Sequence, residues 1–246
     1  MFKKLSALSK FEVNIALDNK GLFIYTLVFP ALYFIYAFFS SNHDLTNTAI
    51  RYHLLGFWSY IILTGVLNQV ITAMISMREN SFLKMFTFIS GDRRLIFYAN
   101  LIPQTLVIQA EILIFDIIAA VFYRPDLEIL EFMFACWLLN FIIIPVVAFY
   151  TSFLLAIPMR AQTLGVFMMG YLLLALLLSY GTTSKLLNIL LVIVNPSSFV
   201  VDVYSLFFAQ TDLMTTLITV SVAGLAYVII GNVIVAKMSL NSVISR

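Results

Sequence analysis

Six long apolar runs constrain this chain more than any other feature of its sequence. Each run is close to the roughly 20 apolar residues that a helix needs to cross the hydrocarbon core of a bilayer. The runs cover residues 21–39, 54–77, 101–122, 132–157, 163–179 and 213–235. They predict an all-α polytopic membrane protein with six transmembrane helices, forming a single transmembrane domain over residues 1–246.

The composition excludes a soluble domain and several kinds of site. Apolar residues make up 62% of the chain and charged residues 11%, whereas soluble domains are about half apolar and a quarter charged. A net charge of +2 is too small to indicate a nucleic-acid partner. The single cysteine, Cys136, can form neither an internal disulfide nor a CxxC metal site. His43 and His53 lack a Cys or carboxylate cluster, so no metal and no other cofactor is assigned to this chain.

The distribution of Lys and Arg predicts the orientation of the spans. The basic residues concentrate in the N-terminal arm, the loop over 78–100, the turn over 158–162 and the C-terminal tail. The alternate loops hold only Arg51, Arg124 and Lys185. By the positive-inside rule, the chain spans the cell membrane with both termini in the cytoplasm. The first run follows a polar arm and precedes no A-x-A cleavage site, which favours an uncleaved span over a signal peptide.

The arm over residues 1–20 carries apolar residues at helical spacing, while its lysines lie off that line. The apolar residues are Phe2, Leu5, Leu8, Phe11 and Ile15. This pattern predicts a helix that lies in the cytoplasmic membrane interface. Two interpretations stay open at this point: a simple membrane-surface helix, or an elbow that packs against a partner or gates lateral entry.

The loop over 78–95 contains a second amphipathic pattern. Phe82, Met85, Phe86 and Ile89 fall at i, i+3, i+4 and i+7, and Ser90-Gly91 is a helix stop. An apolar stripe in the cytoplasm is costly unless something covers it. Either the short helix folds back onto the protein's own spans, or it docks into a groove on a soluble partner.

The stretch over 185–210 contains two apolar arms, 185–195 and 199–209, that are each too short to span. They are separated at Asn195-Pro196, and Pro196 suits an early position in a helix. The pattern predicts a re-entrant helical hairpin on the outer side, with Asn195, Pro196, Phe199 and Asp202 as its characteristic residues. The alternative is one kinked seventh span across 186–209, which would place the C-terminus outside.

Arg78-Glu79 opens the cytoplasmic loop and is followed by Lys84 and Thr87, and Asn195-Pro196 begins a run that ends at Asp202. In these two motifs, and in topology over the whole chain, the sequence resembles the ABC-2 type permeases. These are the membrane subunits of one class of ATP-binding-cassette exporters. The family often has Gly where this chain has Ser81, and Pro where it has Ile89.

The resemblance implies that the chain works as part of a larger assembly. The sequence has no GxxxxGK[ST] phosphate loop, so the chain itself is not an ATPase. The family implies a separate ABC ATPase subunit that binds ATP and Mg, and a second permease copy, as a homodimer or a related heterodimer. The residues expected to couple to the ATPase are Arg78, Glu79, Phe82, Lys84, Met85, Phe86 and Ile89.

Polar residues inside the runs are candidates for a translocation cavity, because such residues face protein or water rather than lipid. The candidates are Asn68, Gln69, Thr72, Gln104 and Glu111, with Asp116 as a second carboxylate. Glu111 and Asp116 lie about 140° apart on an ideal helix, so they do not form a simple pair. These residues either line the cavity and contact cargo, or form hydrogen bonds that fix helix packing.

The leading functional hypothesis is a permease subunit that exports hydrophobic or amphipathic cargo. The expected cargo is a peptide toxin or bacteriocin, such as a phenol-soluble-modulin-like peptide, or a lipophilic drug, with a lipid-linked glycan as an alternative. A secondary transporter or channel that uses Glu111 and Asp116 would leave the Phe/Met stripe without a role. The sequence contains no HExxH or GxSxG motif, which disfavours a membrane-embedded enzyme.

Overall fold

The computed structural model describes residues 24–40, 46–179, 185–208 and 213–241. All regular structure in these ranges is helical, which confirms the all-α class. The predicted interfacial arm over 1–20 lies outside the described residues. The last predicted residues of the hairpin, 209 and 210, also lie outside them.

Five continuous helical stretches are long and apolar enough to cross a membrane, which confirms a polytopic membrane protein. They are Asn47–Glu79, Arg93–Tyr123, Leu127–Ala156, Ala161–Leu178 and Leu213–Lys237. The helix Thr26–Ser40, within the first predicted run, is shorter than these five. A pair of short helices, bent by 117° at residue 195, raises the count to six if the pair is one span. The predicted total of six complete spans plus a hairpin stays a prediction.

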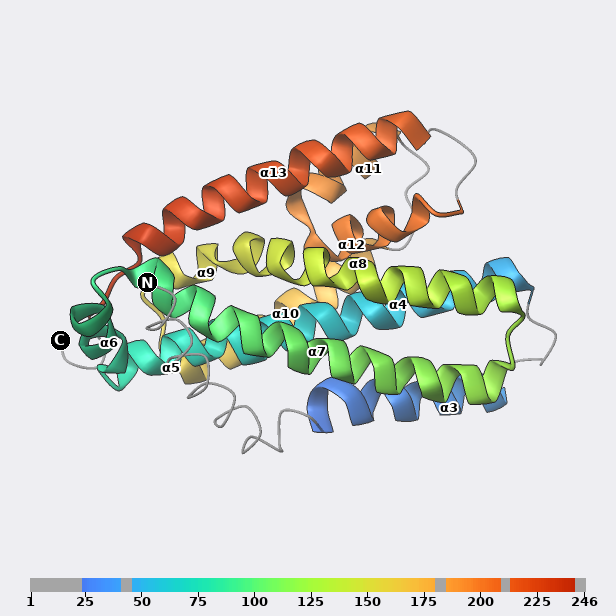
Figure 1. Ribbon diagram of the computed structural model, residues 1–246, viewed down its shortest axis with the longest axis horizontal. Helices are drawn as coiled ribbons and strands as arrows, with labels where there is room; N and C mark the ends of the chain where they lie inside the picture. The colour runs from blue at the N-terminus through green and yellow to red at the C-terminus, as the bar shows by residue number, and fades with distance from the viewer. Residues whose placement is uncertain (1–23, 41–45, 180–184, 209–212, 242–246) are drawn as a thin grey trace.

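The helices lie side by side along the long axis of the molecule, with α6 at one end (Figure 1). We call this the α6 end, and the opposite one the far end. The elements are η1 (Ile24–Val28), α3 (Phe29–Ser40), α4 (Asn47–Gly65), η2 (Val66–Thr72), α5 (Ala73–Glu79), α6 (Phe82–Ser90), α7 (Arg93–Tyr123), α8 (Leu127–Thr151), α9 (Phe153–Ala156), α10 (Ala161–Ser179), α11 (Lys185–Val194), α12 (Pro196–Ser205) and α13 (Leu213–Lys237).

The span formed by α4, η2 and α5 is the centre of the bundle. It is largely buried, whereas α10 and α13 are mostly exposed along their apolar faces. Trp58 of α4 is fully buried and lies edge-on to Tyr204 of α12, with ring centroids 5.3 Å apart. Phe34 of α3 contacts Phe115 of α7 in the same way at 5.5 Å. Large aromatic side chains thus hold four elements together by close packing, because lipid offers no hydrophobic drive between helices.

Two glycines allow helices to approach closely. A Cβ atom at Gly231 of α13 would lie 2.3 Å from the backbone oxygen of Phe149 on α8. A Cβ atom at Gly65 would lie 2.7 Å from the side chain of Ile108 on α7. Small residues at such contacts are the usual way for membrane helices to pack.

Local sequence signals determine where α6 begins and ends. Gly91 ends the helix with a φ of 83°, a left-handed conformation that glycine adopts at no steric cost. Asp92 then starts α7, because its carboxylate accepts a hydrogen bond from the backbone N–H of Arg94 at 2.9 Å. Ser81, at the start of α6, has a φ of 63°, which is costly for a residue with a side chain. Glycine is therefore favoured physically at the position of Ser81.

We expect Ser81→Gly to stabilise the protein. The left-handed conformation costs a non-glycine residue about 1 kcal/mol, and the replacement removes that cost. Gly91→Ala provides the opposite test, because no atom lies within 4 Å of the added Cβ and only the backbone conformation opposes it. Thermal unfolding in detergent should move upward for Ser81→Gly and downward for Gly91→Ala. Equal midpoints for the two variants would contradict this account of the turn.

Candidate functional site

A buried polar site lies where two π-helical segments meet α7. The side chain of Glu111 on α7 is fully buried. Its Oε1 atom accepts hydrogen bonds from the Thr26 hydroxyl at 2.8 Å and from the Gln69 amide nitrogen at 3.0 Å. Thr26 lies in η1 and Gln69 in η2, so both donors come from segments with π-helical hydrogen bonding. Such segments are rare and occur frequently at functional sites. We call Thr26, Gln69 and Glu111 the Glu111 site.

The Glu111 site is only partly satisfied. The Oε2 atom of Glu111 and the side-chain oxygen of Gln69 are both buried and have no hydrogen-bond partner among the described residues. Neither of the two salt bridges among the described residues involves Glu111. A buried carboxyl group with one bare oxygen is costly, and such groups concentrate at functional positions in membrane proteins.

Asp116 belongs to a separate cluster nearer the far end. Its Oδ1 atom accepts a hydrogen bond from the indole N–H of Trp58 at 2.7 Å. Tyr204, which packs against Trp58, donates its hydroxyl hydrogen to the side-chain oxygen of Asn140 on α8. Glu111 and Asp116 thus have different partners, as their angular separation on the helix predicts.

The five residues predicted to line a cavity are not brought together as one site. Gln69 and Glu111 are in contact, and Gln104 is buried two helical turns away along α7. The Thr72 hydroxyl donates to the backbone oxygen of Leu67 and to the sulfur of Met168 on α10. Asn68 is half-buried. None of the five lines the groove described below.

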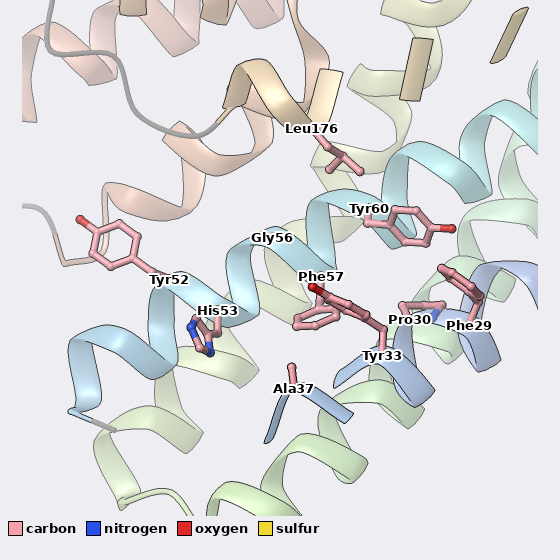
Figure 2. A pocket seen from close by; sticks show the side chains of 10 residues that line it. All are labelled: Phe29, Pro30, Tyr33, Ala37, Tyr52, His53, Gly56, Phe57, Tyr60 and Leu176. Atoms are coloured by element: carbon pink, nitrogen blue, oxygen red, sulfur yellow. The ribbon is translucent and has the colours of Figure 1, made fainter. Parts of the chain in front are cut away.

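An aromatic groove of about 380 Å³ lies over α4, between α3 and α10 (Figure 2). The described residues that form its walls include no Lys, Arg, Asp or Glu. We call it the aromatic groove, and it is lined by Phe29, Pro30, Tyr33, Ala37, Tyr52, His53, Gly56, Phe57, Tyr60 and Leu176. A volume of this size is within the range of ligand pockets, and the lining suits an uncharged, apolar or aromatic group.

The sequence holds a signal for this groove that residue-by-residue reading missed. Phe29, Tyr33 and Ala37 are spaced by four, and so are Tyr52, Gly56 and Tyr60. Each set lies on one helix face. Aromatic side chains in each set thus form walls, and a small residue, Ala37 or Gly56, leaves room between them. Only the packing of α3 beside α4 shows that the two faces meet.

At the α6 end, the amphipathic helix exposes an apolar surface, but the exposed residues differ from those predicted. Phe82, Met85 and Ile89 are 50%, 46% and 61% exposed, and Phe88 is 92% exposed. Phe86, which was expected on this stripe, is instead partly buried against the core, and Leu83 is fully buried. We call Phe82, Met85, Phe88 and Ile89 the α6 patch. Phe88 is missing from the predicted stripe because that stripe was counted from Phe82. Phe88 follows Met85 by three residues, so it shares the exposed face with Met85 and Ile89.

Arg78 and Glu79, expected to couple to an ATPase, are bound to the protein's own chain. Arg78 is 2% exposed and donates to the backbone oxygens of Leu155, Ile157 and Met159 at 3.0, 3.4 and 2.9 Å. Glu79 accepts from the backbone N–H of Ala161 at 2.8 Å. Both side chains are thus bound to residues 155–161, where backbone groups at the helix ends lack helical partners, and coupling through them to an ATPase stays a prediction. Lys84 is exposed.

The hairpin formed by α11 and α12 breaks inside the bundle at a buried asparagine. Asn195 caps α12 by accepting from the backbone N–H of Ser197 at 3.0 Å, and it donates to the backbone oxygen of Ala175 at 2.7 Å. Pro196 is the first residue of α12, where its missing N–H costs nothing. Phe199 is buried against Tyr227 of α13. Asp202 accepts from the Asn188 amide at 3.1 Å and ties α12 to α11.

Comparison with known proteins adds no family to these observations. No protein-family model, curated protein or solved structure matches the chain. Among the described residues, no group of three or more His, Cys, Asp or Glu is placed to hold a metal ion. The groove, the Glu111 site and the α6 patch are therefore interpreted from their own chemistry.

Proposed function

We propose that this chain is the permease subunit of an ATP-driven exporter in the cell membrane, with α6 at the cytoplasmic side. The observation that carries the proposal is the α6 patch. It belongs to a short helix that lies outside the five candidate spans and joins two of them. Four large apolar side chains exposed at the end of a bundle, with Lys84 and Arg94 exposed nearby, suit a helix that docks into a groove on a soluble partner. The partner is an ATPase subunit that supplies the nucleotide site.

The aromatic groove supports an apolar or amphipathic cargo. Aromatic walls without charged side chains bind apolar side chains or rings, and they would leave the charges of a glycan phosphate uncompensated. The groove is open toward the outside of the bundle, with Phe29 and Tyr33 more than half exposed. A second permease copy placed against this side would cover the open side of the groove and complete a path for the cargo. Hydrophobic peptides and lipophilic drugs are the cargo classes that fit such a lining.

The Glu111 site supports a second candidate function. A buried carboxyl group with a bare oxygen and no cationic partner among the described residues is a suitable site for a proton or cation. On this alternative the chain is an ATPase-independent transporter or channel. It gives no role to the α6 patch, so it ranks second.

Replacing Phe88 with Asp should strongly weaken binding of the ATPase encoded nearest to this chain. Phe88 is the most exposed member of the patch, and a charge there cannot enter an apolar groove. Loss of an interface anchor worth about 2 kcal/mol weakens binding at least about thirtyfold. The measurement is co-purification and ATPase rate with the chain reconstituted in nanodiscs. Leu127→Asp is the matched control, because Leu127 is an exposed residue at the opposite end, at the start of α8.

Three outcomes of this experiment are informative. Loss of the ATPase from Phe88→Asp, but not from Leu127→Asp, supports the exporter. An ATPase that stays bound and unchanged in rate would overturn the role of the α6 patch. Transport by liposomes that hold the chain alone, lost in Glu111→Gln, would favour the second candidate instead.

A further inference from the structure

Two adjacent residues at the end of α5, Arg78 and Glu79, connect the loop that carries α6 to the span formed by α10. Arg78 binds the backbone oxygen of Leu155, near the end of α9, and those of Ile157 and Met159 in the turn before α10, and Glu79 binds the first backbone N–H of α10. The two side chains thus reach both sides of the same turn, over 157–161. Figure 1 shows α5, α6 and α9 together at this end of the bundle.

The chemistry of the two side chains matches the helix ends that they bind. The last carbonyl groups of a helix carry partial negative charge, and the first N–H groups carry partial positive charge. Arginine offers a rigid, planar fork of five donors that can bind several carbonyl oxygens in a fixed arrangement, whereas lysine carries a compact ammonium group on a flexible stem. A carboxylate at a helix start is a favourable cap. Each side chain therefore lies at the helix end of opposite charge.

We infer that Arg78 and Glu79 are positioning residues that clamp the 157–161 turn, so that α6 and α10 move as one body. α6 follows Glu79 after only Asn80 and Ser81. The backbone N–H groups of these two residues bond back to Ser76 and Arg78, which leaves little slack in the connection. A displacement of α6 is therefore transmitted through the clamp to the start of α10.

The consequence for transport rests on the proposed function. Leu176 of α10 is a wall of the aromatic groove, and it lies 15 residues, or about 22 Å of helix, after Ala161 at the start of α10. An ATPase that displaces α6 would thereby move the α10 wall of the groove. The regulation proposed is mechanical: the aromatic groove widens or narrows with the position of α6.

A second connection leaves the same loop, and it provides a contrast. Arg93 donates to the backbone oxygen of Met238, just after α13, at 2.6 Å. This bond ties the start of α7 to α13, and it does not involve α10. Arg94, by contrast, is exposed and pairs with Asp92 in its own loop at 3.0 Å. Arg94→Gln is therefore a matched control, because it changes the same loop without touching the clamp.

The clamp can be tested on the chain alone. Glu79→Ala removes the cap, whereas Glu79→Gln keeps an oxygen that accepts from Ala161. Loss of this half-buried, charge-assisted hydrogen bond should speed amide hydrogen exchange in the first turn of α10 by about ten- to a hundredfold. Spin labels at Phe88→Cys and Val166→Cys, on exposed positions of α6 and α10, should give a broader distance distribution. Arg78→Gln should act in the same direction as Glu79→Ala.

The result that overturns the clamp is wild-type exchange and distances in Glu79→Ala. Recovery in Glu79→Gln, with Arg94→Gln unchanged, identifies the hydrogen bond rather than general instability as the cause. In the complex with the ATPase, Glu79→Ala should retain binding but lose the stimulation of ATP hydrolysis by cargo. Retained stimulation would overturn the transmission role. Failure of the wild-type chain to bind the ATPase would overturn the proposed function, and the exchange measurement would still decide the clamp.

Discussion

Replacing Gly231 with Ala should destabilise this protein more than any other single methyl addition to α13. The added Cβ would lie 2.3 Å from the backbone oxygen of Phe149 and 2.8 Å from its carbonyl carbon. Backbone atoms cannot move aside as a side chain can, so α13 must separate from α8. We expect a cost of about 3 kcal/mol, the upper end of overpacking penalties, which lowers the unfolding midpoint by roughly 10 °C.

Gly224→Ala, one more methyl addition on the same helix, is the matched control. Its Cβ would lie 3.5 Å from the ring of Phe199, an ordinary van der Waals distance. This variant should keep the wild-type midpoint or gain slightly, because alanine has the higher helix propensity. Thermal unfolding in detergent, followed by the loss of monodisperse protein, gives both values. Equal midpoints for the two variants would show that α8 and α13 are not packed this closely.

Asn195→Ala is the second substitution with a large expected effect. It removes the cap of α12 and leaves the backbone oxygen of Ala175 and the hydroxyl of Ser198 without their amide donor. A lost cap costs about 1 kcal/mol, and an unsatisfied buried oxygen adds 1–3 kcal/mol, for a total of about 3 kcal/mol. The cost is concentrated where the hairpin turns inside the bundle. Thermal unfolding and the protease sensitivity of the 195–199 segment measure it.

Asn188→Ala is the control for the hairpin, because this side chain makes one bond, to Asp202, in a half-buried position. It should cost less than about 1 kcal/mol. Asn195→Ser keeps a capping oxygen and should fall between the two alanine variants. A cost for Asn195→Ala no greater than that for Asn188→Ala would mean that the break does not depend on this residue.

Apolar runs and helix signals in the sequence predict much of the fold. The stop at Ser90-Gly91 and the break before Pro196 occur where the residues indicate, because glycine and proline act through local backbone geometry. The helix that contains the third predicted span begins about two turns before the apolar run. α7 begins at Arg93 and includes Asn100, since a helix in protein surroundings tolerates polar residues that an apolar run excludes.

The candidate site was less predictable, because its parts come from distant segments. Glu111 was singled out as a buried carboxylate, and its contact with Gln69 joins residues of two predicted spans. Thr26, the other donor, lies in the apolar run over 21–39, and no sequence pattern there indicates that it binds a carboxylate. The partners of Arg78 are backbone oxygens, which every residue has, so no side-chain pattern could reveal them. Charge at the end of a span predicts that a partner is needed, but not which one.

The π-helical segment η2 also determines which way α6 points. Here the Thr72 hydroxyl reaches the backbone oxygen of Leu67, five residues earlier in the chain. The segment holds its residues in a wider turn than an α-helix does. Removing one residue from Val66–Thr72 would restore the narrower turn and rotate everything that follows by about 100°. Arg78 would then face away from the 157–161 turn, and α6 would leave the bundle on another side. The one additional residue in the π-helical turn of η2, near the Glu111 site, thus fixes the direction of α6, which begins more than a full turn further along the chain.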